Sequence, residues 1–353
     1  MKPIIKKLAN LSSLISFGKK SSKSATVASC DFIAGRVLFA AIKAVQPQPE
    51  IVSLIEGPSD QGMSDELLAK SGIQAEFVRT SVKGQGVVYR FLHFPKMNIE
   101  ELSSALLFEA EKYIPFNPQD VVMDHVVIDD HLADAGGGVG MNLLLVAVKK
   151  DEVEAIMKPI LSVNRKIELI DVNILAALNA LEVFHAEDFQ KSVGVLELGG
   201  EVSTLAISQA KKLRFVRELS FGEKDLSQKL KRGMGYSDDE VKKLFRTFDV
   251  PCDPAVAAIL QEVLENLVND LKMSFEYYLD QNASAQAISK LFLCGDIAPM
   301  PAIPEFLQKS FDFPVAGFDL LRCVKIGKAV EPQVLNSNQG MLPIILGRAL
   351  RPV

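Results

Sequence analysis

The residues best suited to chemistry lie in one short stretch, VGVLELGGEVSTLAIS, in the second half of the chain. It combines a carboxylate, two glycines and two hydroxyls, namely Glu197, Gly199, Gly200, Ser203 and Thr204. Glycines let backbone amides approach a phosphate, and the carboxylate beside them could hold a metal ion. The stretch therefore predicts a phosphate loop, although a Gly-Gly turn between apolar strands is also typical of an ordinary β-hairpin.

Other motifs that carry chemistry are missing from the sequence. The four histidines show no spacing typical of metal ligands, and neither a Gly-x-Ser-x-Gly motif nor a Walker loop occurs. We therefore expect core or surface histidines at His93, His125, His131 and His185, and we predict no catalytic residue.

The composition is that of a globular protein long enough for two cores: 353 residues, 48% hydrophobic and 24% charged. A net charge of −5 does not favour nucleic acid as a ligand. The cysteines lack CxxC spacing and stand in apolar surroundings, which predicts reduced, buried thiols and a cytoplasmic location; they are Cys30, Cys252, Cys294 and Cys323. No apolar segment reaches the roughly 20 residues of a membrane span, so membrane contact should be peripheral or through a partner.

The first 24 residues differ from the rest, because they carry six lysines and no acidic residue. Apolar residues recur there at helical spacing, at Ile4, Leu8, Leu11 and Ile15. This pattern predicts either a basic amphipathic helix that rests on anionic lipid or on a partner, or a disordered leader.

The phosphate-loop stretch belongs to the second of two similar series of strands. Short apolar runs broken by Gly, Pro or Asp predict three strands between residues 25 and 57, and three more over 193–220. Such a duplication is the signature of a two-lobed fold with a cleft between related halves. A helix from Ser64 to Gly72 follows the first series.

Between the two series, the pattern from residue 86 predicts the order βαββαβ. Its first helix should be capped by Asn98, bury Leu102, Leu106 and Ala110, and stop at Pro115. We expect both helices to pack on one face of a single inserted sheet. After residue 220 helices dominate, including a long one over 253–280 and a buried last helix in GMLPIILGRAL.

Several segments resemble the PilM family of type IV pilus assembly proteins, relatives of actin and of the division protein FtsA. The most specific is FPKMNIEELSSALLFEAEKYIPFNPQDVVMDHVVID, which is similar to the family's run of Pro, helix, Glu-Ala, Tyr-Ile-Pro-Phe and Asp-Tyr-x-Val. Further similarity lies in LIDVNILAALNAL, RELSFGEKDLSQKLKRGMGYSDDEVKKL, NDLKMSFEYYL and the terminal LGRALR. Together they extend the resemblance over residues 25–351.

The resemblance implies an α/β, actin-like, two-lobed fold of the ribonuclease-H type with an inserted βαββαβ subdomain. The expected organisation is a leader (1–24), the first lobe (25–85), the insertion (86–170), a return to the first lobe (171–192), the second lobe (193–320) and a C-terminal return to the first lobe (321–353).

It also implies that ATP binds between the lobes, with Mg²⁺ near Asp31 and Glu197. The expected nucleotide-binding residues are Asp31, Gly35, Glu197, Gly199, Gly200, Ser203, Thr204 and Gly295. Ile33 stands where the family's first loop has glycine, and a branched side chain there crowds a phosphate, although Gly35 and Arg36 could compensate. In the third loop, Leu293 to Asp296, Gly295 stands alone where the family has Gly-Gly. Glycine is thus lost at two of three loops, which predicts a degenerate site without efficient catalysis.

The implied partner is a PilN-like bitopic membrane protein, whose cytoplasmic segment would lie against the insertion. Apolar side chains there offer walls for a peptide, at Phe94, Phe108, Tyr113 and Phe116. Most apolar residues of such a helix belong to the core, so we expect exposure at Phe108 and Tyr113. The resemblance implies a cytoplasmic position at the inner membrane, and it leaves open contacts with pilus motor ATPases, self-association, an active ATPase or sugar-kinase-like enzyme, and an FtsA-like filament.

Overall fold

The computed structural model describes residues 26–33, 35–45, 48–58, 69, 76–133, 139–246, 253–281 and 284–352. The predicted leader helix, the helix expected from Ser64 and the thiol of Cys252 lie outside these residues. Across the described part of the chain, no helix has both the length and the apolar character needed to cross a bilayer.

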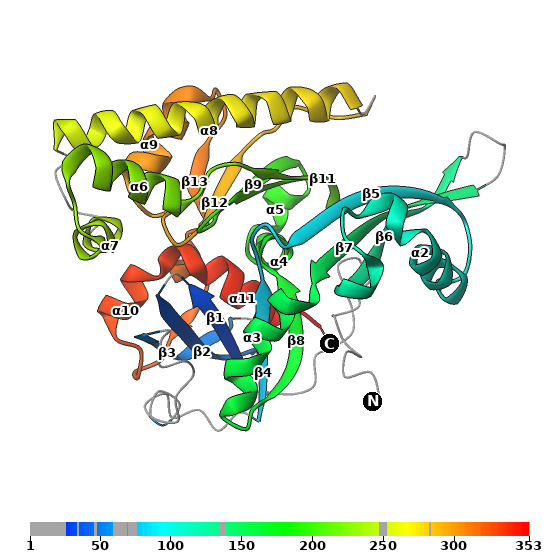
Figure 1. The fold of residues 1–353 in the computed structure, drawn as a ribbon, viewed down its shortest axis with the longest axis horizontal. Coiled ribbons are helices and arrows are strands. Elements are labelled where there is room, and N and C mark those ends of the chain that lie inside the picture. Colours follow the sequence, from blue (N-terminus) through cyan, green and yellow to red (C-terminus); the bar gives the residue numbers. More distant parts are fainter. Residues whose placement is uncertain are drawn as a thin grey trace.

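The first half of the molecule is built on a six-stranded sheet (Figure 1). Its order is β14-β3-β2-β1-β4-β8. The strands are β1 (Thr26–Ile33), β2 (Arg36–Lys43), β3 (Glu50–Pro58), β4 (Phe77–Val82), β8 (Lys166–Val172) and β14 (Lys325–Ile326). β1, β2 and β3 form an antiparallel meander, while β4 runs parallel to β1 and β8 parallel to β4.

The second half repeats this arrangement in a five-stranded sheet of order β11-β10-β9-β12-β13. The strands are β9 (Ser192–Leu198), β10 (Ser203–Gln209), β11 (Lys212–Leu219), β12 (Leu291–Gly295) and β13 (Val315–Gly317). Here too an antiparallel meander is followed by two parallel strands. The shared order, with the first meander strand beside the fourth strand, confirms the predicted duplication.

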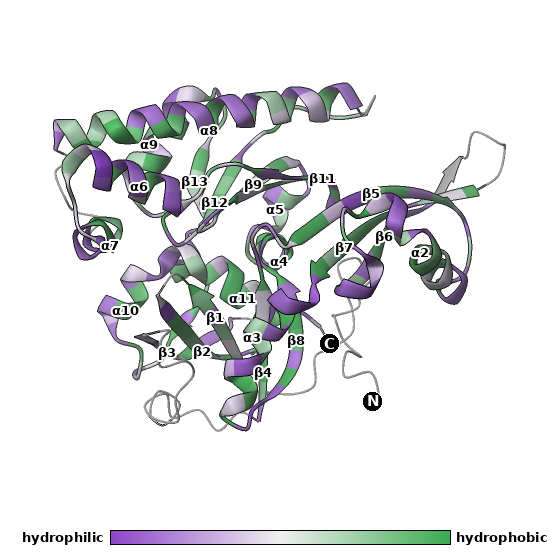
Figure 2. Ribbon diagram, in the orientation of Figure 1, coloured by the Kyte–Doolittle hydropathy of each residue, from purple (hydrophilic) through white to green (hydrophobic). Residues whose placement is uncertain are grey.

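Two apolar helices fill the space between the sheets, α4 (Asn173–Phe184) and α11 (Leu342–Leu350) (Figure 2). A helix that is apolar on all sides is stable only when it is buried on all sides. α4 and α11 cross closely at Gly347, where an added Cβ would lie 1.8 Å from the carbonyl oxygen of Ala176. The last helix is therefore buried, as predicted.

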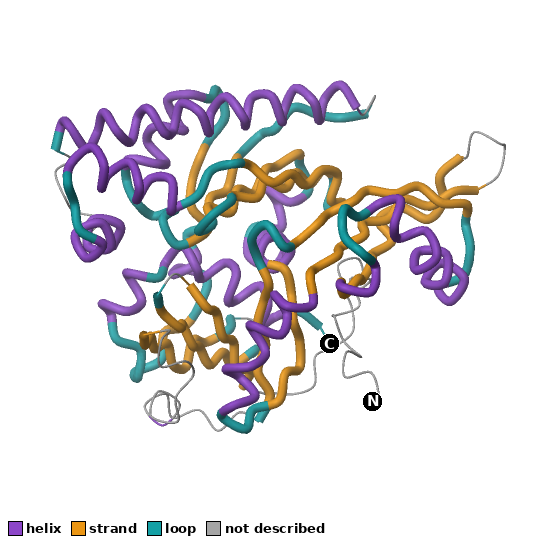
Figure 3. The backbone as a smooth tube through the Cα atoms, in the orientation of Figure 1, coloured by secondary structure: helices purple, strands orange, loops and turns teal. Residues whose placement is uncertain are grey.

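The remaining helices cover the outer faces of the sheets (Figures 1 and 3). α8 (Pro254–Gln281) crosses the outside of the second half, with α6 (Glu223–Met234), α7 (Asp238–Arg246) and α9 (Ala302–Ser310) near it. Short helices complete the fold: α5 (Ala186–Phe189), α10 (Pro332–Ser337), η3 (Pro118–Asp120), η4 (Leu320–Arg322) and η5 (Gln339–Met341).

The inserted subdomain is a three-stranded sheet that projects from the first half (Figure 3). Its order is β5-β7-β6, from β5 (Val87–Pro95), β6 (Val121–Ala133) and β7 (Val139–Lys149). α2 (Ile99–Tyr113) packs on it through Leu102, Leu106 and Ala110, and Asn98 forms the expected capping box with Glu101.

The prediction that the insertion includes its last helix and strand in a single inserted sheet was wrong. α3 (Lys150–Ser162) and β8 follow β7 in the predicted order, but they do not join the inserted sheet. β8 pairs with β4, and Ile160 of α3 packs with Ala28 and Val78 of the six-stranded sheet. The order of elements along the chain does not determine which of two sheets a strand joins. Here α3 packs its apolar face on the six-stranded sheet, and β8 pairs with that sheet.

The cysteine prediction holds for two residues and fails for a third. Cys30 and Cys294 are free and buried, whereas Cys323 is only partly buried because it lies at the end of the surface turn η4.

Candidate functional site

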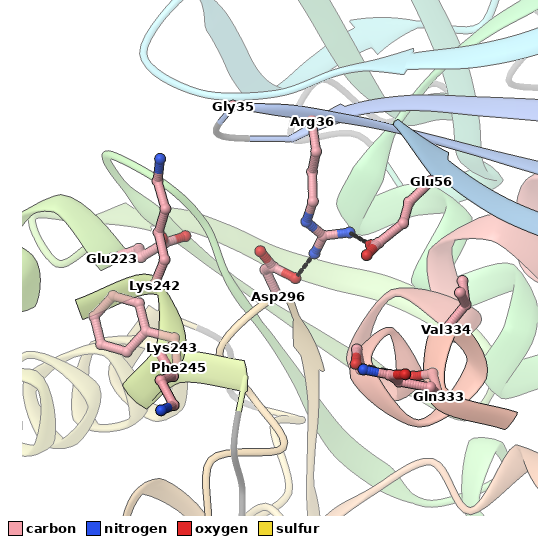
Figure 4. Close-up of a pocket in the computed structure, with 11 residues that line it drawn as sticks. Gly35, Arg36, Glu56, Glu223, Lys242, Lys243, Phe245, Asp296, Gln333 and Val334 are labelled. Atoms are coloured by element: carbon pink, nitrogen blue, oxygen red, sulfur yellow. Dashed lines mark hydrogen bonds and ion pairs between the residues drawn. The ribbon is translucent and has the colours of Figure 1, made fainter. Parts of the chain in front are cut away.

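The two halves enclose a cavity of about 660 Å³ (Figure 4). Gly35 and Arg36 line it from the turn between β1 and β2, and Asp296 lines it from the end of β12. The start of α6 contributes Glu223, and α7 contributes Lys242. The cavity lies between the β1–β2 turn of the first half and the α6, α7 and β12 ends of the second half; of the predicted nucleotide-binding residues, Gly35 alone is among the residues that line it. Its volume is in the range typical of ligand pockets.

The Gly-Gly turn after β9 is held against α6. Glu223 and Lys224, the first residues of α6, donate their backbone N–H groups to the carbonyl oxygens of Gly199 and Gly200 at 3.0 and 2.9 Å. Gly295 packs against the same turn from the other side. Its φ is +104°, and an added Cβ would lie 2.2 Å from the carbonyl oxygen of Leu198. Only glycine fits there, which explains the single glycine that remains in this third loop.

Arg36 spans the cleft from the first half to the second (Figure 4). Its guanidinium pairs with Glu56 of β3 at 3.3 Å, with Asp296 across the cleft, and with the side chain of Asn338. The side chain is almost fully buried. Lys242 approaches the same turn from α7, since a Cβ added at Gly35 would lie 3.9 Å from its Nζ. Arg36 and Lys242 thus face the cavity from opposite halves, and its lining also includes Lys243 and the carboxylates of Glu56, Glu223 and Asp296.

Asp31 lies on β1, buried and outside the lining of the cavity, and it is paired with the guanidinium of Arg348 from α11. We call the buried cluster of charged residues around Asp31 and Glu197 the inner end of the cleft. Nη1 of Arg348 donates to Oδ1 of Asp31 at 3.0 Å, and Nη2 donates to Oδ2. Burial disfavours the charged carboxylate, but Arg348 outweighs burial, with help from Lys83 and Ser81, and the pKa of Asp31 is held below its ordinary value. Asp31 is therefore a buried, ionised carboxylate whose charge is already balanced.

Glu197 faces the same place from β9 of the other half, but its surroundings differ. Nδ2 of Asn173, at the start of α4, donates to its Oε1 at 2.6 Å. Burial raises the pKa of Glu197 above its ordinary value, against the opposing effects of Asn173 and the Lys83 ammonium. The hydroxyl of Ser81 bonds to Oδ1 of Asn173. A buried polar network therefore connects the two carboxylates.

The two hydroxyls that follow the Gly-Gly turn point in different directions. Thr204 pairs across the strands with Glu197, so both side chains lie on the face of the sheet that looks into the molecule. Ser203 lies on the opposite face with Leu205 and Ile207, which pack in the core beneath α8. The structure brings Thr204 to the site with Asp31 and Glu197, and it places Ser203 away from it.

A divalent metal at this end would need free carboxylate oxygens and room for water. Both oxygens of Asp31 accept from Arg348, and Asp31 and Glu197 are only 3% and 5% exposed. Among the described residues, no group of three acidic, histidine or cysteine side chains is arranged to hold a metal ion. The side chains as they stand do not fit a magnesium ion.

Two important cations were missed in the sequence, Arg348 and Lys242. Arg348 had a detectable signal, because it is a charged residue within the otherwise apolar run LPIILGRAL, and such a residue needs a buried partner. Lys242 had none, because α7 is amphipathic and its lysines are typical of a solvated face.

The four predicted partner-binding residues have different environments on the inserted subdomain. Phe108 is 89% exposed, whereas Phe94 is 6% exposed and packs between the sheet and α2. The expected exposure of Tyr113 was wrong, because this residue follows Leu102, Leu106 and Ala110 at helical spacing and packs with them; it is half-buried, and its hydroxyl donates to Glu109 at 2.8 Å. Phe116 is also half-buried, beneath the ammonium of Lys149.

The repeated sheets, the two helices between them and the cleft define an actin-like two-lobed protein. Residues 62–353 match the family model of the type IV pilus assembly protein PilM. The chain therefore belongs to the PilM family, whose role is in type IV pilus assembly.

Solved structures show the same fold. A structure described as the "PilM-PilN type IV pilus biogenesis complex" matches with a TM-score of 0.79 and 22% identity, covering 93% of this chain and 98% of that chain. The ethanolamine utilization protein EutJ from Carboxydothermus hydrogenoformans matches with a TM-score of 0.52 and 12% identity, covering 94% of this chain and 92% of that chain.

Proposed function

We propose that the protein is a cytoplasmic adaptor of type IV pilus assembly. The inserted subdomain binds the N-terminal cytoplasmic segment of a PilN-like membrane protein, and ATP occupies the cavity between the halves as a structural ligand. The observation that carries the proposal is a pair of large apolar side chains left uncovered on an acidic helix, α2.

The uncovered pair consists of Leu107 and Phe108, which are 67% and 89% exposed. They lie off the buried stripe of α2, so the folding of the subdomain does not require them to be apolar. Adjacent exposed residues of this size are typical of a surface that a partner covers. We call Leu107 and Phe108 the α2 surface; Tyr113 is not part of it, because it continues the buried stripe and packs against Phe94.

The charge of α2 suits a segment that lies beside the cytoplasmic face of a membrane. The helix carries four glutamates and one lysine, namely Glu100, Glu101, Glu109, Glu111 and Lys112. Cytoplasmic segments next to a membrane span are enriched in Lys and Arg. A basic peptide with apolar side chains would therefore complement the α2 surface in both charge and hydrophobicity.

The solved PilM-PilN complex supports the choice of partner. Its matching chain shares this fold over nearly its whole length. A PilN-like protein is thus the natural candidate for the α2 surface, and attachment to the membrane would come through that partner.

A peptide copy of the PilN N-terminus tests the partner. We expect Phe108→Ser to weaken binding by about tenfold or more, because the apolar anchor is lost while the charge of α2 stays the same. Met273→Ser is the matched control, since Met273 is half exposed on α8, at a distance from α2. Equal affinities for the two variants would remove the α2 surface from the proposal.

The proposal for ATP rests on the cavity and its cations. Arg36 and Lys242 face it from opposite halves, and the Gly-Gly turn after β9 is bonded to the start of α6, whose Glu223 lines the cavity. Arg36 is held by Glu56 and Asp296, so a phosphate must compete with these carboxylates. ATP serves as a structural ligand because Asp31, the charged carboxylate of the inner end, is engaged by Arg348.

Calorimetric titration with ATP tests this second part. We expect saturable binding that falls by about tenfold in Arg36→Gln, the loss of one charged contact. Arg322→Gln is the control, because Arg322 is an exposed arginine outside the cavity. ATP turnover that Glu197→Gln abolishes would instead assign hydrolysis to the cleft.

A further inference from the structure

The inner end of the cleft already contains the positive charge that a metal ion would bring. Arg348 is fully buried, and all five of its N–H donors have acceptors. Nε and Nη2 donate to the hydroxyl of Ser29 at 3.1 and 2.6 Å, Nη1 to Ser81, and Nη1 and Nη2 to Asp31. The guanidinium is thus held in one orientation by three residues from two strands, β1 and β4.

This arrangement uses the oxygens of Asp31 that would coordinate a metal. A carboxylate that accepts from both terminal nitrogens of an arginine is engaged through both of its oxygens. In addition, the hydroxyl of Ser81 lies 3.2 Å from Oδ1 of Asp31. Magnesium binds with most of its water retained and needs an open, oxygen-lined space. Asp31, at 3% exposure, offers no such space.

Glu197, which faces Asp31 from the second half, also has a cation of the chain near it, Lys83. Glu197 accepts from Asn173, and the ammonium of Lys83 acts on both Glu197 and Asp31. The neighbouring Asp171 pairs with Nε of Arg351 at 2.8 Å. Since these carboxylates already lie beside Arg348, Lys83 and Arg351, a divalent ion would add uncompensated charge to a buried site, which is costly.

We propose that Arg348 replaces a divalent metal at the inner end of the cleft, so that the cleft takes its nucleotide without a metal ion. The ligand's phosphates face the protein's own cations instead: Arg36 and Lys242 at the cavity, with Lys83 toward the inner end. The absence of a metal site is a property of the chain alone, while metal-free binding of ATP rests on the proposed function.

The first experiment uses no nucleotide, so it is independent of the proposed function. Mn²⁺ is titrated into the full-length protein and followed by electron paramagnetic resonance. We expect no stoichiometric site. A site in the wild type that disappears in Asp31→Asn would overturn the proposal. Arg348→Met should gain Mn²⁺ binding, because it frees Asp31.

Because Arg348→Met leaves a buried charge and could fail to fold, the double variant Asp31→Asn/Arg348→Met is made beside it. We expect the double variant to recover most of the thermal midpoint lost by Arg348→Met, since both charges of the pair are gone. A double variant no more stable than Arg348→Met would show that the two side chains are not coupled, which contradicts an internal cation at Asp31.

The second experiment compares ATP titrations in excess Mg²⁺ and in excess EDTA. We expect dissociation constants within about twofold of each other. A loss of about tenfold or more in EDTA would overturn the proposal. No ATP binding under either condition would refute the proposed ligand, and the Mn²⁺ titration would then decide the role of Arg348 by itself.

Discussion

The turns that join β1 to β2 and β9 to β10 occupy equivalent positions in the two halves, yet their carboxylates have opposite electrostatic environments. Asp31 is ionised because a buried guanidinium balances it. Burial instead raises the pKa of Glu197, whose hydrogen-bond donor among the described residues is the neutral amide of Asn173. The sheet order that surrounds them is the same. The difference therefore comes from the helices between the sheets: α11 supplies Arg348, and α4 supplies Asn173. A duplicated fold fixes where a carboxylate lies, and the packing partner decides its charge.

The largest effect on stability is expected from Arg348→Met, which removes the difference between the two carboxylates by leaving the charge of Asp31 buried without its partner. Removing one partner of a buried ion pair costs about 3–5 kcal/mol of unfolding free energy. Asn173→Ala, the equivalent change beside Glu197, should cost about 1–3 kcal/mol, because a neutral hydrogen bond is lost. Urea unfolding measures both. Equal losses in the two variants would contradict the assigned difference between the carboxylates.

The glycines of the turns give the next largest difference. Gly295→Ala should cost about 3 kcal/mol, because the new Cβ meets the carbonyl oxygen of Leu198 and the residue has a positive φ. Gly35→Ala should cost about 1–2 kcal/mol, since its φ is also positive but the space around it is open. Thermal unfolding measures the order. A larger loss at Gly35 would mean that the first turn is the more tightly packed one.

The two carboxylates should also give stability opposite dependences on pH. The lowered pKa of Asp31 stabilises the fold above the ordinary aspartate range, and this contribution is lost as pH falls through the folded-state pKa. The raised pKa of Glu197 acts in the other sense: its contribution is present at low pH and is lost as pH rises through the folded-state pKa. Glu197→Gln should therefore flatten the decline of stability with rising pH. Unfolding curves across the acidic to neutral range measure this, and an unchanged profile would exclude Glu197 as its cause.

The smallest effect separates the two hydroxyls after the Gly-Gly turn. Ser203 is buried, and its Oγ has no hydrogen-bond partner among the described residues. Ser203→Ala should change stability by about 0.5 kcal/mol or less and leave ATP affinity unaltered, because it faces the core beneath α8. Thr204→Ala should be the more harmful of the two for ATP binding, because Thr204 shares the face of Glu197. Calorimetric titration of both variants with ATP tests which hydroxyl faces the ligand. A loss of ATP affinity in Ser203→Ala alone would show that Ser203, and not Thr204, is that residue.

The amino-acid pattern alone predicts the elements of the two sheets and their order along the chain. Periods of two and near four residues predicted the paired meanders and the amphipathic face of α2, and Asn98 predicted its capping box. These features depend on residues close together in the chain, which is why they can be read without a structure. The exposure of Phe108 followed from the same periodicity.

Three features come from the packed fold and not from local pattern: β8 joins the first sheet, Phe94 is buried, and Arg348 reaches Asp31 from the far end of the chain. Each of these depends on contacts between segments distant in sequence, where several partners are chemically acceptable and packing selects one. The phosphate-loop stretch shows both contributions: its carboxylate and glycines are plain in the sequence, but whether Glu197 and Asp31 carry free charge is settled by the helices packed between the two sheets.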